Sequence, residues 1–275
     1  MKTEKIDLYG YFGINRPSGA SGYLNAYIIE RSEEFSKNRI RPAMLVIAGG
    51  GYGMVSDREK EPIALYYLAQ GFDSFTLEYS IEPISYPYQL LEGCMAMAYI
   101  RENADILGVD REHVSAVGFS AGGHLCAMLA TISDEKEIKD FLGDKVSLCR
   151  PDAVVLSYPV ITLGEKTHYG TSINISGGNE EIKGRLSMQN RVNEKSSPAF
   201  IWSTVDDATV PCENSLYMAT AYKKAGVPFE LHIFESGVHG SSLATEEVNT
   251  PNAPVSEWTS LSVTWLKNRG FKIKN

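Results

Sequence analysis

Short apolar runs rich in β-branched and aromatic residues recur along the chain and alternate with longer stretches of helical period. Six of these runs predict buried strands: Ala43–Ala48, Phe72–Tyr79, Val114–Phe119, Ala153–Tyr158, Ala199–Val205 and Phe229–Glu235. Strands that alternate with helices are typical of a parallel sheet covered by helices on both faces. The pattern therefore predicts an α/β protein with a mostly parallel, doubly wound sheet.

The stretches between the strands place apolar residues three and four positions apart, which indicates helices. Helices are predicted from Ser56 to Tyr67, around Leu91–Ala98 with an end at Gly108, over Ala121–Thr131, from Glu213 to Gly226 and around Trp258–Trp265. Ser56 and Glu59 resemble a capping box, in which both side chains bond the first turn of the helix. We therefore expect the helix at Ser56 to begin with that box.

Two parts of the chain depart from the alternation. Lys5–Phe12 and Tyr23–Arg31 predict strands joined by turn-forming residues, which indicates an antiparallel N-terminal edge of the sheet. Residues 161–198 are polar and glycine-rich without a long periodic element, so they predict a small insertion that serves as a lid or binding segment. Because no linker or repeat divides the sequence, we expect residues 1–275 to form a single domain.

Charge and composition exclude some classes of partner. The 275 residues include 26 basic and 34 acidic ones, a formal net charge of −8. Nucleic acid is not expected as a partner, because phosphate binding needs clustered Lys and Arg. No apolar run approaches the ~20 residues that span a membrane, and the amino terminus lacks the pattern of a signal peptide. The sequence therefore predicts a cytoplasmic protein, without contact to a membrane.

The cysteines and acidic residues show no spacing typical of metal ligands, so neither a metal nor another cofactor is predicted. Cys94 and Cys126 lie in apolar helical patterns and are expected to pack as small core residues. The sequence is compatible with a homo-oligomer as well as with a monomer.

The run Gly118-Phe-Ser-Ala-Gly-Gly-His124 is the most informative motif of the chain. It places G-x-S-x-G between a predicted buried strand and a helix of small residues, which is the setting of a nucleophile elbow. The turn presents the Ser120 side chain at the carboxyl end of the strand. A serine hydroxyl is a weak nucleophile, so it needs a base that a carboxylate holds in place.

His239 is the predicted base, because it follows the strand Phe229–Glu235 in a loop flanked by glycines. His232 belongs to a sheet face, His113 lies at the opposite edge, and His124 is expected to pack within the helix after Ser120. The carboxylate should follow the strand Ala199–Val205, where the chain has Asp206 and Asp207 side by side. Their side chains diverge, and the residues alone leave the choice between them open.

Gly49-Gly-Gly-Tyr-Gly53 follows the first predicted parallel strand. Consecutive glycines let the backbone approach a ligand and present unobstructed N–H groups, as an oxyanion hole requires. The Ala121 N–H, at the start of the next helix, is a further donor. The patterns of a phosphate-binding loop do not occur here. Candidate walls of the acyl pocket, each of which could equally pack in the core or lie on the surface, are Tyr52, Tyr158, His168, Tyr169 and Met188.

In combination, these motifs resemble the bacterial α/β-hydrolase esterases that include acetyl-xylan and related carbohydrate acetyl esterases. The segments that carry the resemblance are Gly49–Tyr52, Val55–Glu59, Gly118–His124, Asp207–Pro211 and Val238–Gly240. The resemblance implies an α/β-hydrolase fold with Ser120 as nucleophile and His239 as base. It assigns the acid role to Asp207, three residues before the Val of Val-Pro, and the oxyanion hole to Gly50, Gly51 and Ala121.

The predicted function is a serine esterase that hydrolyses short-chain acyl esters, acetyl esters first, of xylan-type carbohydrates or other small alcohols. Two alternatives compete with it. One is a small peptidase of the same fold, although such peptidases usually carry a propeller or cap that the chain lacks. The other is a non-catalytic binding protein on a hydrolase fold, although such proteins commonly lack one of the three catalytic residues.

Overall fold

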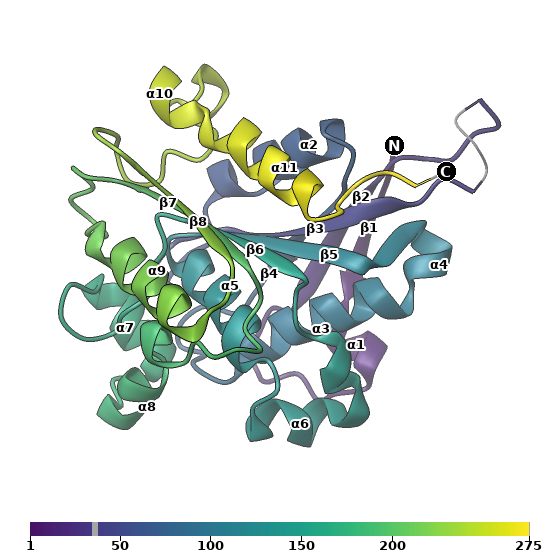
Figure 1. Ribbon diagram of the computed structural model, residues 1–275. Helices are drawn as coiled ribbons and strands as arrows, with labels where there is room; N and C mark the ends of the chain where they lie inside the picture. The colour runs from purple at the N-terminus through teal and green to yellow at the C-terminus, as the bar shows by residue number, and fades with distance from the viewer. Residues whose placement is uncertain (35–37, 275) are drawn as a thin grey trace.

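The computed structural model describes residues 1–34 and 38–274. Within these residues the backbone forms one eight-stranded sheet with helices on both sides (Figure 1). The strands are β1 (Lys2–Asp7), β2 (Tyr23–Ile28), β3 (Arg41–Ile47), β4 (Asp73–Glu78), β5 (Val109–Phe119), β6 (Ala153–Ser157), β7 (Ala199–Thr204) and β8 (Phe229–Phe234).

The α-helices are α1 (Leu8–Phe12), α2 (Glu61–Ala69), α3 (Tyr88–Glu102), α4 (Ala104–Leu107), α5 (Ala121–Ile132), α6 (Lys136–Leu142), α7 (Tyr169–Ser176), α8 (Glu180–Arg185), α9 (Glu213–Ala225), α10 (Ala253–Ser256) and α11 (Trp258–Asn268). Four 3₁₀ turns in the described residues are η1 (Asp57–Glu59), η2 (Gly143–Leu148), η3 (Met188–Asn190) and η4 (Glu246–Val248).

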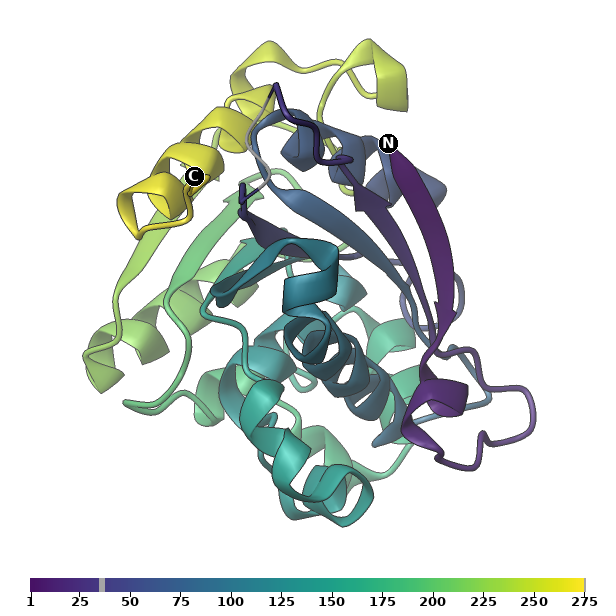
Figure 2. The same cartoon turned by 90° about the vertical axis from the view of Figure 1, so that its right-hand side faces the viewer.

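The strand order is β1-β2-β4-β3-β5-β6-β7-β8. Strands β3 to β8 run parallel to one another, and β1 and β2 join them at β4 as an antiparallel edge, seen in purple in Figure 2. The predicted parallel sheet and its predicted antiparallel N-terminal edge are both confirmed. Parallel strands bring their carboxyl ends to one edge of the sheet, and ligand sites gather there.

Residues of β3 show how the sheet separates two cores. Leu45 and Ile47 belong to the cluster packed under α3, α5 and α9, whereas Met44 and Val46 belong to the cluster under α2 and α11. Alternate residues of a strand point to opposite faces, so a strand buried on both sides is apolar throughout. This is why β3 was recognisable as a continuous apolar run.

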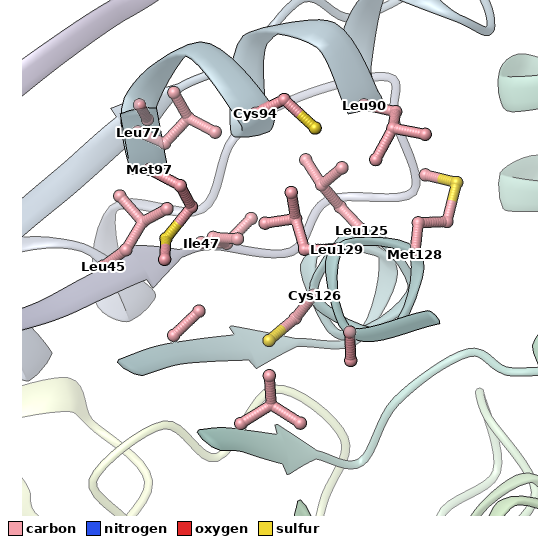
Figure 3. Packing of buried hydrophobic residues seen from close by; sticks show 14 of the residues in the cluster. Leu45, Ile47, Leu77, Leu90, Cys94, Met97, Leu125, Cys126, Met128 and Leu129 are labelled. Atoms are coloured by element: carbon pink, nitrogen blue, oxygen red, sulfur yellow. The ribbon is translucent and has the colours of Figure 1, made fainter. Parts of the chain in front are cut away.

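The larger core lies between the sheet and the helices α3 and α5 (Figure 3). Cys94 of α3 and Cys126 of α5 are buried there among leucine and methionine side chains, as predicted. All four cysteines are free thiols. No helix of residues 1–34 and 38–274 is long and apolar enough to cross a membrane. The cytoplasmic location stays a prediction.

Three local predictions need correction. The expected strand Lys5–Phe12 ends at Asp7, because its carboxylate accepts a hydrogen bond from the Gly10 N–H at 3.1 Å and caps the helix α1. Ser56 caps nothing with its side chain, and α2 begins only at Glu61, after η1. Glu59 turns inward instead of back to Ser56, so the predicted capping box is wrong.

The polar segment 161–198 contains the short helices α7 and α8 and the turn η3. It packs against the glycine-rich loop after β3, since the Asn174 side-chain amide donates to the Gly51 carbonyl at 2.9 Å. A segment fastened to that loop forms part of the wall around the carboxyl ends of the strands. The treatment of residues 1–275 as one domain stays a prediction.

Candidate active site

Ser120 lies in the sharp turn between β5 and α5, with φ 52° and ψ −117°. A non-glycine residue adopts such a strained conformation only where the surroundings enforce it, and these residues cluster at active sites. The helix α5 approaches the neighbouring strand β3 so closely that a β-carbon at Gly122 would lie 2.2 Å from the Ile47 carbonyl oxygen. Glycine is therefore required there, and the turn has the geometry of a nucleophile elbow.

Three side chains from three loops meet in one hydrogen-bonded row. His239, in the loop after β8, has its Nε2 2.8 Å from the Ser120 Oγ. Its Nδ1 lies 2.6 Å from Oδ2 of Asp207, in the loop after β7. The Asp207 side chain is buried, and its Oδ1 accepts hydrogen bonds from the Thr209 and Val210 amides at 2.9 Å. Geometry of this kind activates a serine hydroxyl.

Asp206 points away from this row. Its carboxylate accepts hydrogen bonds from the Ser236 hydroxyl at 2.6 Å and the Gly237 amide at 2.7 Å. The Ser236 bond, followed by the Gly237 bond, holds the pKa of Asp206 below its usual range. Asp206 thus ties the loop after β7 to the loop after β8, and it makes no hydrogen bond to His239.

The loop after β3 leaves unused N–H groups beside Ser120. The Gly50 carbonyl accepts hydrogen bonds from the Gly53 and Met54 amides at 3.0 and 3.1 Å, which folds the loop into a tight turn. Within the described part of the chain, the amides of Gly50, Gly51 and Ala121 donate to no protein acceptor. Ala121 is the first residue of α5, where the helix dipole adds positive potential. These three amides are available to a negatively charged oxygen.

A cavity of about 230 Å³ opens over Ser120. Its lining residues include Gly50, Gly51, Met54, Ser56, Arg58, Glu59, Ser120, His168, Thr209, His239 and Gly240. Burial and the nearby His239 lower the pKa of the His168 side chain. The sequence had not suggested Met54, Arg58, Glu59 or Thr209 as lining residues, although all but Met54 stand in segments that carry the family resemblance.

Of the five predicted pocket walls, only His168 lines this cavity. Tyr52, Tyr158 and Met188 are buried in the interior, and Tyr169 is 75% exposed. An aromatic residue beside a functional loop looks the same in sequence whether it faces the cavity or the core. Tyr52, Tyr158, Tyr169 and Met188 are therefore withdrawn as pocket walls.

Tyr52 instead forms a buried link through His124. The Tyr52 hydroxyl lies 3.0 Å from the His124 Nδ1, and the His124 Nε2 lies 2.8 Å from the Leu186 carbonyl oxygen. A carbonyl only accepts, so Nε2 carries the ring proton and Nδ1 accepts from Tyr52. His124 joins α5 to the glycine-rich loop and to residues 161–198, which agrees with its predicted packing role.

Acidification is expected to destabilise the protein through His124. Burial lowers the pKa of this neutral imidazole to about 4. In the unfolded chain His124 binds a proton near pH 6.5, whereas in the folded chain it stays neutral down to about pH 4. The stabilising contribution of His124 is therefore lost as the pH falls from about 6.5 to about 4. The loss amounts to roughly 3 kcal/mol. Thermal unfolding of wild type and His124→Gln across this pH range measures it.

His124→Gln keeps a donor and an acceptor but does not titrate, so it should lose less stability on acidification than wild type. Burial raises the pKa of the Asp73 carboxyl to about 6 and of the Glu92 carboxyl to about 7. Their contributions have the opposite sign, being lost as the pH rises, but they are common to both proteins and cancel in the difference. Identical pH dependence of the two unfolding curves would contradict the prediction.

Among the described residues, no group of three or more His, Cys, Asp or Glu side chains is placed to hold a metal ion. His113 lies toward the amino-terminal end of β5, opposite the end that carries Ser120, and pairs with Asp110 at 2.8 Å. His232 pairs with Glu230 at 2.8 Å on β8. Both histidines lie where the sequence predicted, away from Ser120.

The fold and the arrangement at Ser120 define an α/β hydrolase, and comparison with known proteins agrees. The BD-FAE family model matches residues 32–222. A solved structure of an acetyl ester-xyloside bifunctional hydrolase from Caldicellulosiruptor lactoaceticus superimposes with a TM-score of 0.84 at 36% identity. The alignment covers 98% of this chain and 97% of that one.

Two curated relatives are much longer than this chain. Endo-1,4-beta-xylanase B of Butyrivibrio fibrisolvens is 37% identical over 214 residues, which cover 75% of this chain and 33% of the relative. An acetylxylan esterase of Xylanibacter ruminicola is 30% identical over 211 residues, covering 74% of this chain and 42% of the relative. The chain therefore spans less than half the length of either.

The chain belongs to the BD-FAE family. The predicted resemblance to α/β-hydrolase esterases of the acetyl-xylan type is confirmed, and so is the predicted class of carboxylic ester hydrolases.

Proposed function

We propose that this protein is a serine esterase that removes short acyl groups, acetyl first, from xylan-type carbohydrates. The observation that carries the proposal is the row of hydrogen bonds from Ser120 through His239 to Asp207. The names of the relatives, an acetylxylan esterase and an acetyl ester-xyloside hydrolase, support the substrate class.

In the proposed mechanism, the Ser120 Oγ attacks the ester carbonyl carbon while the His239 Nε2 takes its proton. Asp207 holds the imidazole in the tautomer that leaves Nε2 free, and it stabilises the imidazolium that forms. The carbonyl oxygen becomes negatively charged and accepts hydrogen bonds from the Gly50, Gly51 and Ala121 amides. One such donor is worth about 2.7–4 kcal/mol of the barrier.

The tetrahedral intermediate collapses when the His239 imidazolium returns the proton to the leaving alkoxide, which departs as the free sugar hydroxyl. Water then attacks the acyl-enzyme, His239 again acts as base, and the carboxylic acid leaves Ser120. Every proton transfer in this cycle passes through His239, which lies within hydrogen-bonding distance of both Ser120 and Asp207, so the cycle needs no further residue for proton transfer.

Labelling with an organophosphonate tests this assignment. The reagent should modify Ser120 alone, and labelling should abolish release of acetate from acetylated xylo-oligosaccharides. Modification of another serine together with loss of activity would refute the assignment. Release of amino acids from aminoacyl chromophores, without release of acetate, would favour a peptidase of the same fold.

Acyl length should control the rate strongly. The cavity of about 230 Å³ must hold the acyl group and the first part of the alcohol. Each methylene gains about 0.8 kcal/mol where it can be buried, whereas one that overlaps the residues lining the cavity costs more than it gains. We therefore expect kcat/KM to be highest for acetyl or propionyl p-nitrophenyl esters and to fall steeply beyond butyryl.

The same ester series distinguishes a short-chain preference from an open apolar cleft, since the leaving group is constant and only the acyl chain length changes. A kcat/KM that rises through octanoyl would show an open apolar cleft and would exclude a short-chain preference.

A further inference from the structure

Glu59 is a buried carboxylate beside the active site that the proposed steps do not use. It is only 3% exposed. Its Oε2 accepts a hydrogen bond from the Gly49 amide at 2.7 Å, and its Oε1 accepts one from the Tyr158 hydroxyl at 2.6 Å. A buried carboxylate is costly unless its partners compensate for the lost hydration. The burial of this carboxylate therefore indicates a role in function.

The hydrogen bonds to Glu59 match those of an ionised carboxylate. The Tyr158 oxygen accepts a hydrogen bond from the Ser242 amide at 3.0 Å, so its single proton is free to go to Glu59. Both carboxylate oxygens therefore accept from donors, as the two oxygens of an ionised carboxylate do. Burial raises the pKa of the Glu59 carboxyl, and the bonds from Tyr158 and Gly49, with the nearby His239, act in the opposite direction.

Through these partners Glu59 is connected to three loops of the site, those after β3, β6 and β8. Gly49 directly precedes the amides of Gly50 and Gly51, and a β-carbon on it would lie 2.8 Å from the Ser120 Cβ. The Tyr158 ring lies edge-on to the His239 ring, with centroids 5.1 Å apart. Ser242, which Tyr158 bonds, follows His239 by three residues in the same loop.

We propose that Glu59 is a positioning residue of the esterase, which fixes the oxyanion loop through Gly49 and stabilises the protonated His239 with its negative charge. The inference rests on the proposed function. Asp207 bonds one nitrogen of the imidazole, and Glu59 of η1, which accepts from the hydroxyl of the Tyr158 ring beside His239, supplies a second negative charge. Charge that is fixed before the reaction stabilises the developing imidazolium without reorganisation.

The charge on His239 responds to several groups on different elements. The titratable and charged groups around it are Asp207 after β7, Glu59 and Arg58 of η1, Tyr158 after β6 and His168 before α7. Removal of one negative charge from this set should disfavour the imidazolium that forms when His239 takes the Ser120 proton.

Glu59→Gln tests the proposal because it keeps the size of the side chain and removes the charge. We expect kcat to fall about tenfold to a hundredfold, since a charge-assisted hydrogen bond is lost at the oxyanion loop. KM should change little, and the acidic limb of the kcat/KM profile should move about one unit to lower pH. Steady-state kinetics from pH 4 to 9 on p-nitrophenyl acetate measure all three.

Glu92→Gln is the matched control. Glu92 is likewise buried and accepts from a tyrosine, Tyr9 at 3.0 Å, and from a backbone amide, Ser80 at 2.6 Å, but it lies away from the active site. Its loss should alter the Tm without moving kcat or the acidic limb. A Glu59→Gln enzyme with wild-type kcat and an unmoved acidic limb would overturn the proposal.

Tyr158→Phe serves as a second variant if Glu59→Gln does not fold. It keeps the ring beside His239 and removes only the bonds to Glu59 and Ser242, so kcat should again fall. Wild-type kcat in this variant would overturn the proposal. Activity that survives Ser120→Ala would instead refute the proposed function, so the two failures are distinguishable.

Discussion

Ser120→Ala is expected to reduce kcat for acetyl ester hydrolysis by roughly 10⁴ to 10⁶, as loss of the nucleophile does in serine hydrolases. The Oγ is the atom that bonds the acyl carbon, and no other hydroxyl lies in the row with His239 and Asp207 among the described residues. The substitution removes a hydroxyl at the floor of the cavity rather than core volume, so the Tm should change little. Release of p-nitrophenol from the acetate ester measures the activity.

Ser260→Ala is a suitable control. Ser260 is exposed on α11, and among the described residues its hydroxyl bonds only Glu257. Its activity should equal that of wild type. A Ser120→Ala protein that keeps more than a few per cent of wild-type turnover would show that another nucleophile performs the reaction.

The fold could be predicted from the sequence wherever burial on both faces makes a strand apolar throughout. Strands β3, β6 and β7 are buried along their whole length and stood out for this reason, and the helices between the strands showed regular apolar spacing. The failure at Lys5–Phe12 has a local cause. Tyr9 and Phe12 have strand-like side chains, yet the Asp7 carboxylate caps the turn and starts a helix. One hydrogen bond there outweighed the propensity of the residues.

The site was predictable where the chemistry demands both a residue type and a place after a strand. Ser120, His239 and the aspartate pair satisfied both demands. The pocket walls were not predictable, because the direction of a side chain such as Tyr52 depends on a partner, His124, that lies far along the chain. The place of Glu59 beside the active site could not be predicted for the same reason. Its spacing from Ser56 imitates a capping box, whereas its partners are Gly49 and Tyr158.

Asp207→Asn is expected to lower kcat by roughly 10⁴, the loss found when a triad aspartate of a serine protease is changed to asparagine. The Asp207 Oδ2 accepts from the His239 Nδ1, so the ring keeps its proton on Nδ1 and offers Nε2 to Ser120. An asparagine amide donates to Nδ1 and favours the tautomer protonated on Nε2, which cannot accept the Ser120 proton. The pH profile of kcat and the rate of phosphonate labelling both report the loss.

Asp206→Asn is the matched control, because the two aspartates are adjacent and the substitution is the same. Asp206 binds Ser236 and Gly237, not His239, so the variant should keep its activity within a few-fold of wild type. Weaker hydrogen bonds to the loop that carries His239 should lower the Tm of this variant. If Asp206→Asn were the inactive variant and Asp207→Asn the active one, the acid of the triad would be Asp206. A comparable loss in both would mean that the loop, rather than one carboxylate, sets the tautomer of His239.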